Sequence, residues 1–179
     1  ATAELYQKVS SKTGKRPPLF ITHITGIFDD HMKNVVAAFG ISIDPAVLAQ
    51  AGCAVARKQY RLLKERGYPV GMLGGGARGL HHFTEFVGSD MHVTINWQGT
   101  ADRLIAEDRP LTARMDLPTP DEVIRELSDR IPDFRKAWDE DGLTPDQFME
   151  YGAVELFRSM FIKGWDVVLA TIKRLRNGQ

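Results

Sequence analysis

Apolar and polar positions follow one another along this chain in a pattern that predicts short strands separated by helices. Residues 19–24 form an apolar run rich in β-branched and aromatic side chains, which is typical of a buried strand. Residues 68–73 and 91–97 have the same character, so three strands are predicted. Because helices are predicted between them, the pattern indicates an α/β fold with βαβ units and a parallel sheet.

Helices are predicted from capping residues and from apolar positions at helical spacing. Residues 1–12 read as the body of a helix, and Asp29 and Asp30 are expected to cap a helix that runs to residue 39. Asp44 followed by proline predicts a helix that continues to residue 66. The other predicted helices are residues 80–87, 99–106, 121–130, 133–139 and 144–176.

The last predicted helix carries large apolar side chains at helical spacing. Such a stripe is most simply explained by packing against the core of the protein. It consists of Phe148, Tyr151, Leu156, Met160 and Trp165.

Composition narrows the class of protein. The 179 residues suffice for a single domain, residues 1–179, and the hydrophobic share of 43% is ordinary for a globular protein. Lys plus Arg equal Asp plus Glu at 23 each, which removes the basic excess typical of nucleic-acid binding. No apolar run is long enough to span a bilayer. The lone cysteine, Cys53, fits a reducing compartment, so we expect a cytoplasmic protein. From the charge balance and the short apolar runs we expect neither a nucleic-acid nor a membrane partner.

The glycine-rich residues 74–79, called the glycine loop below, follow the second predicted strand and contain Gly74, Gly76 and Gly79 in G-x-G-x-x-G spacing. One interpretation is a dinucleotide site, but the next strand ends in Asn96 rather than in the acid that would hold a ribose. A second is a loop that binds a monophosphate, with Arg78 as a guanidinium donor. In the third, the glycines only permit a tight turn.

The five histidines are the main candidates for metal ligands: His23, His31, His81, His82 and His92. On a helix, the adjacent His81 and His82 should point in different directions and not share one ion. His23 ends one strand and His81 follows the next, so these two are expected to approach each other and His23 is a candidate acid or base. We predict neither a metal nor a cofactor.

Several stretches, taken in order, resemble the C-terminal half of a transaldolase. The stretch Thr-His-Ile-Thr-Gly at residues 22–26 resembles the Ser-Pro-Phe-Val-Gly that ends the family's sixth strand, and residues 72–79 resemble its seventh-strand Met-Gly-Ala-Ser-Phe-Arg-Asn. Residues 86–90 resemble Leu-Ala-Gly-Cys-Asp, and residues 92–95 its eighth strand. The resemblance extends over about residues 18 to 175 and implies the last three strands of a (β/α)8 barrel, closed by a long C-terminal helix.

The resemblance also implies a site. Arg78 would bind a sugar phosphate, and Thr22 stands where the family has a serine near the substrate. Gly75 and Gly76 belong to the loop whose amides would bind the phosphate, although the family has a serine at the position of Gly76. Ile27 stands where the family has an arginine, so together with the serine at Gly76 two phosphate donors are missing, and His23 replaces a proline of the family. Asn96 is a candidate to bind a sugar hydroxyl at the end of the third strand; the alternative is that this end packs against the last helix.

Transaldolases form a Schiff base on a lysine of the fourth strand, and no lysine of this chain falls in a predicted strand. We therefore expect part of an enzyme of carbohydrate metabolism that moves or cleaves a three-carbon ketol unit of a sugar phosphate. The chain alone should be inactive, with the missing N-terminal half or a second copy as partner. The alternative is a non-catalytic half-barrel that binds a phosphate ligand or oligomerises through its open sheet edges.

Overall fold

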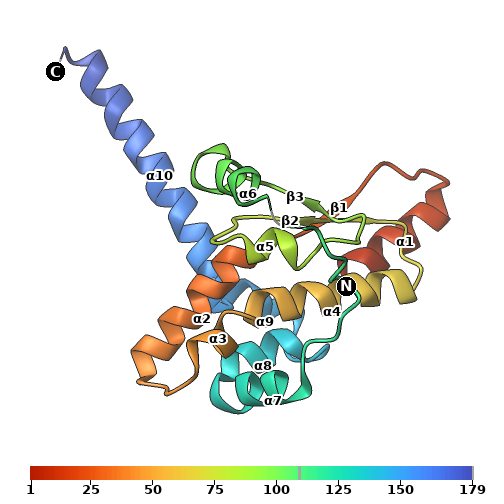
Figure 1. The fold of residues 1–179 in the computed structure, drawn as a ribbon. Helices are drawn as coiled ribbons and strands as arrows, with labels where there is room; N and C mark the ends of the chain where they lie inside the picture. Colours follow the sequence, from red (N-terminus) through yellow and green to blue (C-terminus); the bar gives the residue numbers. More distant parts are fainter. Residues whose placement is uncertain (109, 179) are drawn as a thin grey trace.

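The computed structural model describes residues 1–108 and 110–178, and within them a small parallel sheet lies among helices (Figure 1). Its strands are β1 (Phe20–His23), β2 (Gly71–Gly74) and β3 (His92–Val93), arranged in chain order. Phe20 pairs with Gly71 and Leu73 with His92. The predictions of an α/β fold and of three parallel strands are confirmed; a closed barrel is not formed by the described residues.

Helices make up most of the remaining chain. Before β3 they are α1 (Thr2–Thr13), α2 (Thr25–Phe39), α3 (Pro45–Leu48), α4 (Ala51–Glu65) and α5 (His81–Thr84). After β3, an irregular turn labelled η1 (Trp97–Ala101) leads into α6 (Asp102–Glu107). The last helices are α7 (Asp121–Arg130), α8 (Pro132–Trp138), α9 (Pro145–Glu150) and α10 (Gly152–Arg176).

Local signals explain most helix ends. Asp44 accepts a hydrogen bond from the amide of Ala46, and Thr144 forms a capping box with Gln147, so both predicted starts are confirmed. The prediction of one unbroken helix after each start is wrong, because α3 and α4 are separated at residues 49–50 and α9 and α10 at Tyr151. The prediction that Asp29 and Asp30 cap α2 is wrong. The helix begins at Thr25, which places both acids inside its second turn.

Two hydrophobic clusters form the core. The first lies between the sheet and α4, where Cys53, Ala56 and Leu63 surround Met72 of β2. The second joins α2 to α7 and α8 and includes Phe28, Met32, Leu127, Ile131 and Phe134. Figure 1 shows α2 and α4 below the sheet, with α7 and α8 as a further layer beneath them.

The opposite face of the sheet is open. Side chains alternate between the two faces of a strand, so Phe20 and Thr22 share one face of β1 while Ile21 and His23 share the other. Phe20 is 49% exposed and Thr22 is exposed, whereas Ile21 and His23 are partly buried on the helix side. A barrel interior would cover the open face, and the described residues do not provide one.

The long helix α10 does not close over the sheet. It leaves the body and points away from it (Figure 1), and Trp165 is 61% exposed. The expectation that the apolar stripe is core is therefore wrong for Phe148, Met160 and Trp165, which are exposed, whereas Tyr151 is buried and Leu156 is partly buried. Tyr151 is buried and donates its hydroxyl proton to the carbonyl oxygen of Asp133, which anchors the break between α9 and α10. Gly152 follows because any side chain there would collide with the ring of His31.

Candidate functional site

The candidate site lies at the carboxyl edge of the sheet, where the glycine loop leaves β2. The amide of Gly75 donates to the carbonyl of His23 at 3.1 Å, which extends the pairing of the two strands. Gly76 has φ of 62° and lies against α2, where a Cβ on Gly26 would be 1.6 Å from the Gly76 carbonyl oxygen. Both glycines are therefore needed for the close approach of loop and helix.

Three backbone amides of the glycine loop remain available to a ligand. The amide of Gly75 is occupied by His23, and that of Arg78 donates to Nδ1 of His82. Those of Gly76, Ala77 and Gly79 donate to no acceptor in residues 1–108 and 110–178. The turn thus presents unused donors next to Arg78, the group that sequence reasoning singled out.

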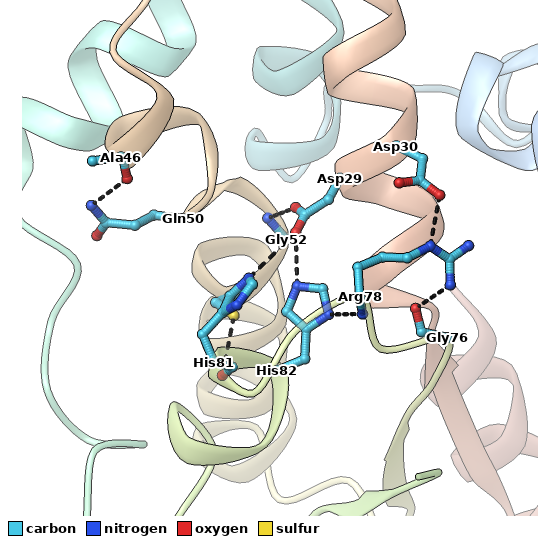
Figure 2. Close-up of polar contacts among 10 residues, drawn as sticks. Asp29, Asp30, Ala46, Gln50, Gly52, Gly76, Arg78, His81 and His82 are labelled. Carbon is cyan, nitrogen blue, oxygen red and sulfur yellow. Dashed lines mark hydrogen bonds and ion pairs between the residues drawn. The ribbon is translucent and has the colours of Figure 1, made fainter. Parts of the chain in front are cut away.

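Arg78 is held on both sides of its guanidinium, as Figure 2 shows. Its Nε donates to Oδ2 of Asp30 at 2.8 Å and its Nη1 to the carbonyl of Gly76 at 2.8 Å. The side chain is 34% exposed, and Nη2 donates to no group in the part of the chain that the structure describes. The arginine is pre-oriented, but Asp30 offsets part of its charge.

A buried acid, Asp29, lies below the glycine loop, where the sequence predicted only a helix cap. Asp29 accepts a hydrogen bond from the amide of Gly52 at 2.8 Å, and its other carboxylate oxygen lies 2.7 Å from Nε2 of His82 (Figure 2). Burial alone would raise the pKa of Asp29, but the imidazoles of His81 and His82 and the Gly52 amide outweigh it, so the pKa is lowered. Asp29 is therefore a buried carboxylate whose surroundings favour the ionised form.

Position along α2 explains why Asp29 is buried. Thr25, Asp29 and Met32 recur at helical spacing on one buried face of the helix, and Asp29 is the charged member of that set. A carboxylate on such a face needs partners from other elements. This spacing is the signal by which sequence reasoning could have found it.

The two adjacent histidines do not diverge as expected. Their ring centroids lie 4.1 Å apart, and His81 Nε2 is 3.9 Å from the same Asp29 oxygen that contacts His82. Both belong to the first turn of the four-residue α5, directly after the irregular loop. The 3.9 Å between His81 Nε2 and Asp29 is too long for a hydrogen bond. Nε2 of His81, which is buried, therefore has no hydrogen-bond partner among the described residues.

Cys53, His81 and His82 bring one donor atom each to within 4.8 Å of one another, which is the only such group of three or more in the described residues. Both nitrogens of His82 already have partners, Arg78 and Asp29. Two available donors fall short of the four ligands of a structural zinc site. Burial raises the pKa of the Cys53 thiol, which argues equally against a nucleophile. We assign Cys53 a structural role.

His23 lies on the helix side of the sheet, beneath the site rather than in it. Burial lowers its pKa to about 4, and its Nε2 has no hydrogen-bond partner in the described part of the chain. It faces the opposite way from Thr22, so one ligand cannot contact both side chains. The sequence predicts that His23 approaches His81. The two Nε2 atoms make no hydrogen bond to each other, and the His23 ring lies 5.8 Å from the ring of Phe28, near Asp29.

The end of β3 adds little to the site. Asn96 is exposed, and its carbonyl accepts from the amide of Ala101 and the hydroxyl of Thr100. Trp97 is 70% exposed, so the alternative of burial against the last helix is wrong. The side chain of Asn96 remains a candidate contact.

Within residues 1–108 and 110–178 no lysine lies on a strand, as the sequence predicts. Lys58 of α4 is the only lysine of the described chain that is not exposed. Its ammonium group donates to the Trp138 carbonyl and lies 4.3 Å from the ring centroid of that residue. It faces α8, away from the glycine loop.

Comparison of the chain with protein-family models, curated proteins and solved structures finds no match. None of the helices described is both long and apolar enough to cross a membrane.

Proposed function

We propose that this chain forms the phosphate-binding side of an aldolase-type (β/α)8 enzyme. The reaction moves or cleaves a three-carbon ketol unit of a sugar phosphate through a lysine Schiff base. One observation carries the proposal: the glycine loop, at the carboxyl edge of a parallel sheet, combines unused backbone amides with a pre-oriented arginine. The carboxyl ends of barrel strands are where barrel enzymes bind their substrates.

The donors suit a phosphate group. The amides of Gly76, Ala77 and Gly79 and Nη2 of Arg78 offer hydrogen bonds to several oxygens at once, and charge-assisted bonds from a guanidinium are the stronger ones. Asp30 opposes a dianion because its carboxylate lies 2.8 Å from Arg78 Nε. Phosphate binding would therefore be moderate in strength and sensitive to Asp30.

The open face of the sheet supports a partial barrel. Thr22 lies on this face, one residue before the end of β1. The edges of β1 and β3 pair with no further strand in the residues that the structure describes. In the proposed enzyme, strands from outside these 179 residues cover that face, and one of them supplies the lysine.

Calorimetric titration with fructose 6-phosphate, fructose and inorganic phosphate tests the proposal. We expect fructose 6-phosphate and inorganic phosphate to bind, and fructose to bind far more weakly. Arg78→Ala should weaken phosphate binding at least about tenfold, whereas Arg125→Ala, at an exposed arginine of α7, is the matched control and should not. Asp30→Asn should strengthen binding. Equal affinity for fructose, or equal effects of the two arginine variants, would contradict the proposal.

A second candidate is a non-catalytic half-barrel that oligomerises. The exposed apolar side chains of α10 favour it, because Phe161, Trp165 and Leu175 are each more than 60% exposed. Sedimentation of the chain with and without residues 158–176 separates the two. Self-association that depends on α10, with no phosphate binding, would favour this candidate.

A further inference from the structure

Two neighbouring acids of α2 hold the two ends of one arginine. Asp30 binds the guanidinium of Arg78 directly. Asp29 acts on the backbone of the same residue through His82, whose ring lies between the Asp29 carboxylate and the Arg78 amide (Figure 2). Asp29 and His82 are 3% and 1% exposed, so this chain of contacts is shielded from water.

The hydrogen bonds define the tautomer of His82. A backbone N–H can only donate, so Nδ1 of His82, 3.0 Å from the Arg78 amide nitrogen, must carry its lone pair. The proton of the neutral ring is then on Nε2 and is donated to Oδ2 of Asp29 at 2.7 Å. The ionised carboxylate selects this tautomer, and the tautomer selects the orientation of the Arg78 peptide.

We propose that His82, oriented by Asp29, is a positioning residue for phosphate binding by the glycine loop. Nδ1 of His82 accepts the hydrogen bond of the Arg78 amide, so this amide is not available to a ligand. His82 thereby holds the peptide so that Arg78 can reach Asp30 and the Gly76 carbonyl. The amides of Gly76, Ala77 and Gly79 stay available as a set. This inference rests on the proposed phosphate site.

Two substitutions separate positioning from general stability. His82→Asn keeps an acceptor near the place of Nδ1 but loses the donor to Asp29. His82→Gln keeps a donor near the place of Nε2 but loses the acceptor for Arg78. Each variant loses one hydrogen bond at the same buried position. The bond to the Asp29 carboxylate involves a charged group, so His82→Asn should lose more free energy of unfolding than His82→Gln, whereas the positioning role predicts the opposite order for affinity.

Fructose 6-phosphate affinity should distinguish them. We expect His82→Gln to bind about tenfold more weakly than the unmodified chain, and His82→Asn to stay within about threefold of it. The amide proton of Arg78 should keep its hydrogen-bonded chemical shift in His82→Asn and lose it in His82→Gln. Equal affinity losses in both variants, or no loss in either, overturn the positioning role.

Nitrogen-15 spectra of the unmodified chain test the same arrangement without any variant. A protonated Nε2 and an unprotonated Nδ1 of His82 are expected, and the reverse tautomer overturns the inference even if neither variant folds. An unmodified chain that binds no phosphate at all instead refutes the proposed function. The two failures are therefore distinguishable.

Discussion

Replacing His23 by leucine should make the protein more resistant to acid. Its imidazole is buried, its Nε2 has no hydrogen-bond partner in the described residues, and burial lowers its pKa from 6.5 to about 4. The folded protein therefore keeps His23 neutral, whereas the unfolded chain takes up a proton near pH 6.5. Below that pH the unfolded state binds more protons, so stability falls as the pH falls toward 4.

The size of this effect follows from the difference between the two pKa values. One pKa unit corresponds to about 1.4 kcal/mol, so His23 should cost the folded state about 2 kcal/mol at about pH 5 and nearly nothing at about pH 7.5. His23→Leu removes that cost. The free energy of unfolding of His23→Leu, relative to that of the unmodified chain, should therefore rise by about 2 kcal/mol as the pH falls from about 7.5 to about 5.

Urea unfolding of both proteins at the two pH values measures this change. His92→Leu, at an exposed histidine of β3, controls for the loss of an imidazole as such. A relative change below about 0.5 kcal/mol for His23→Leu would refute the reasoning, because His23 would then be free to take up a proton in the folded state.

Four further results are expected. Asp29→Asn should lower the free energy of unfolding by about 3 kcal/mol in urea, since the carboxylate accepts from His82 and Gly52, and the loss should shrink as the pH falls through the lowered pKa of Asp29; an unchanged midpoint would count against the buried contact. Gly26→Ala should destabilise by at least about 1 kcal/mol because its Cβ would meet the Gly76 carbonyl, and a neutral result would mean that the loop moves freely. Zinc should leave Tm unchanged, whereas a rise that disappears in Cys53→Ser would mean that the cluster binds metal. Borohydride with fructose 6-phosphate should leave the intact mass of this chain unchanged; a trapped adduct would place the Schiff-base lysine within it.

Short-range signals predicted the sheet and several helix ends. The three apolar runs become strands in the expected order, and the caps at Asp44 and Thr144 depend only on residues within three positions. The predicted strands were too long because the pairing stops where β3 ends at Val93. Extents of this kind depend on the partner strand, which a run of apolar residues does not reveal.

The buried contacts of the site could not be predicted in the same way. Asp29 and His82 are 53 positions apart, and only the packing of α2 against α4 and the glycine loop brings them together. Sequence reasoning therefore took Asp29 for a cap. It identified Arg78 because a basic side chain beside glycines is a local pattern. It also gave the correct period for α10 but not the surroundings of that helix, since periodicity describes a face and not what covers it.

Amide chemical shifts of the chain during titration with fructose 6-phosphate test the central claim most directly. The account predicts that the amide signals of Gly76, Ala77 and Gly79 move together and saturate, and that inorganic phosphate moves the same signals. The Gly75 amide, which is bound to His23, should respond least within the loop. Saturable shifts that exclude these three amides, or no saturable shifts at all, would contradict a phosphate site in the glycine loop.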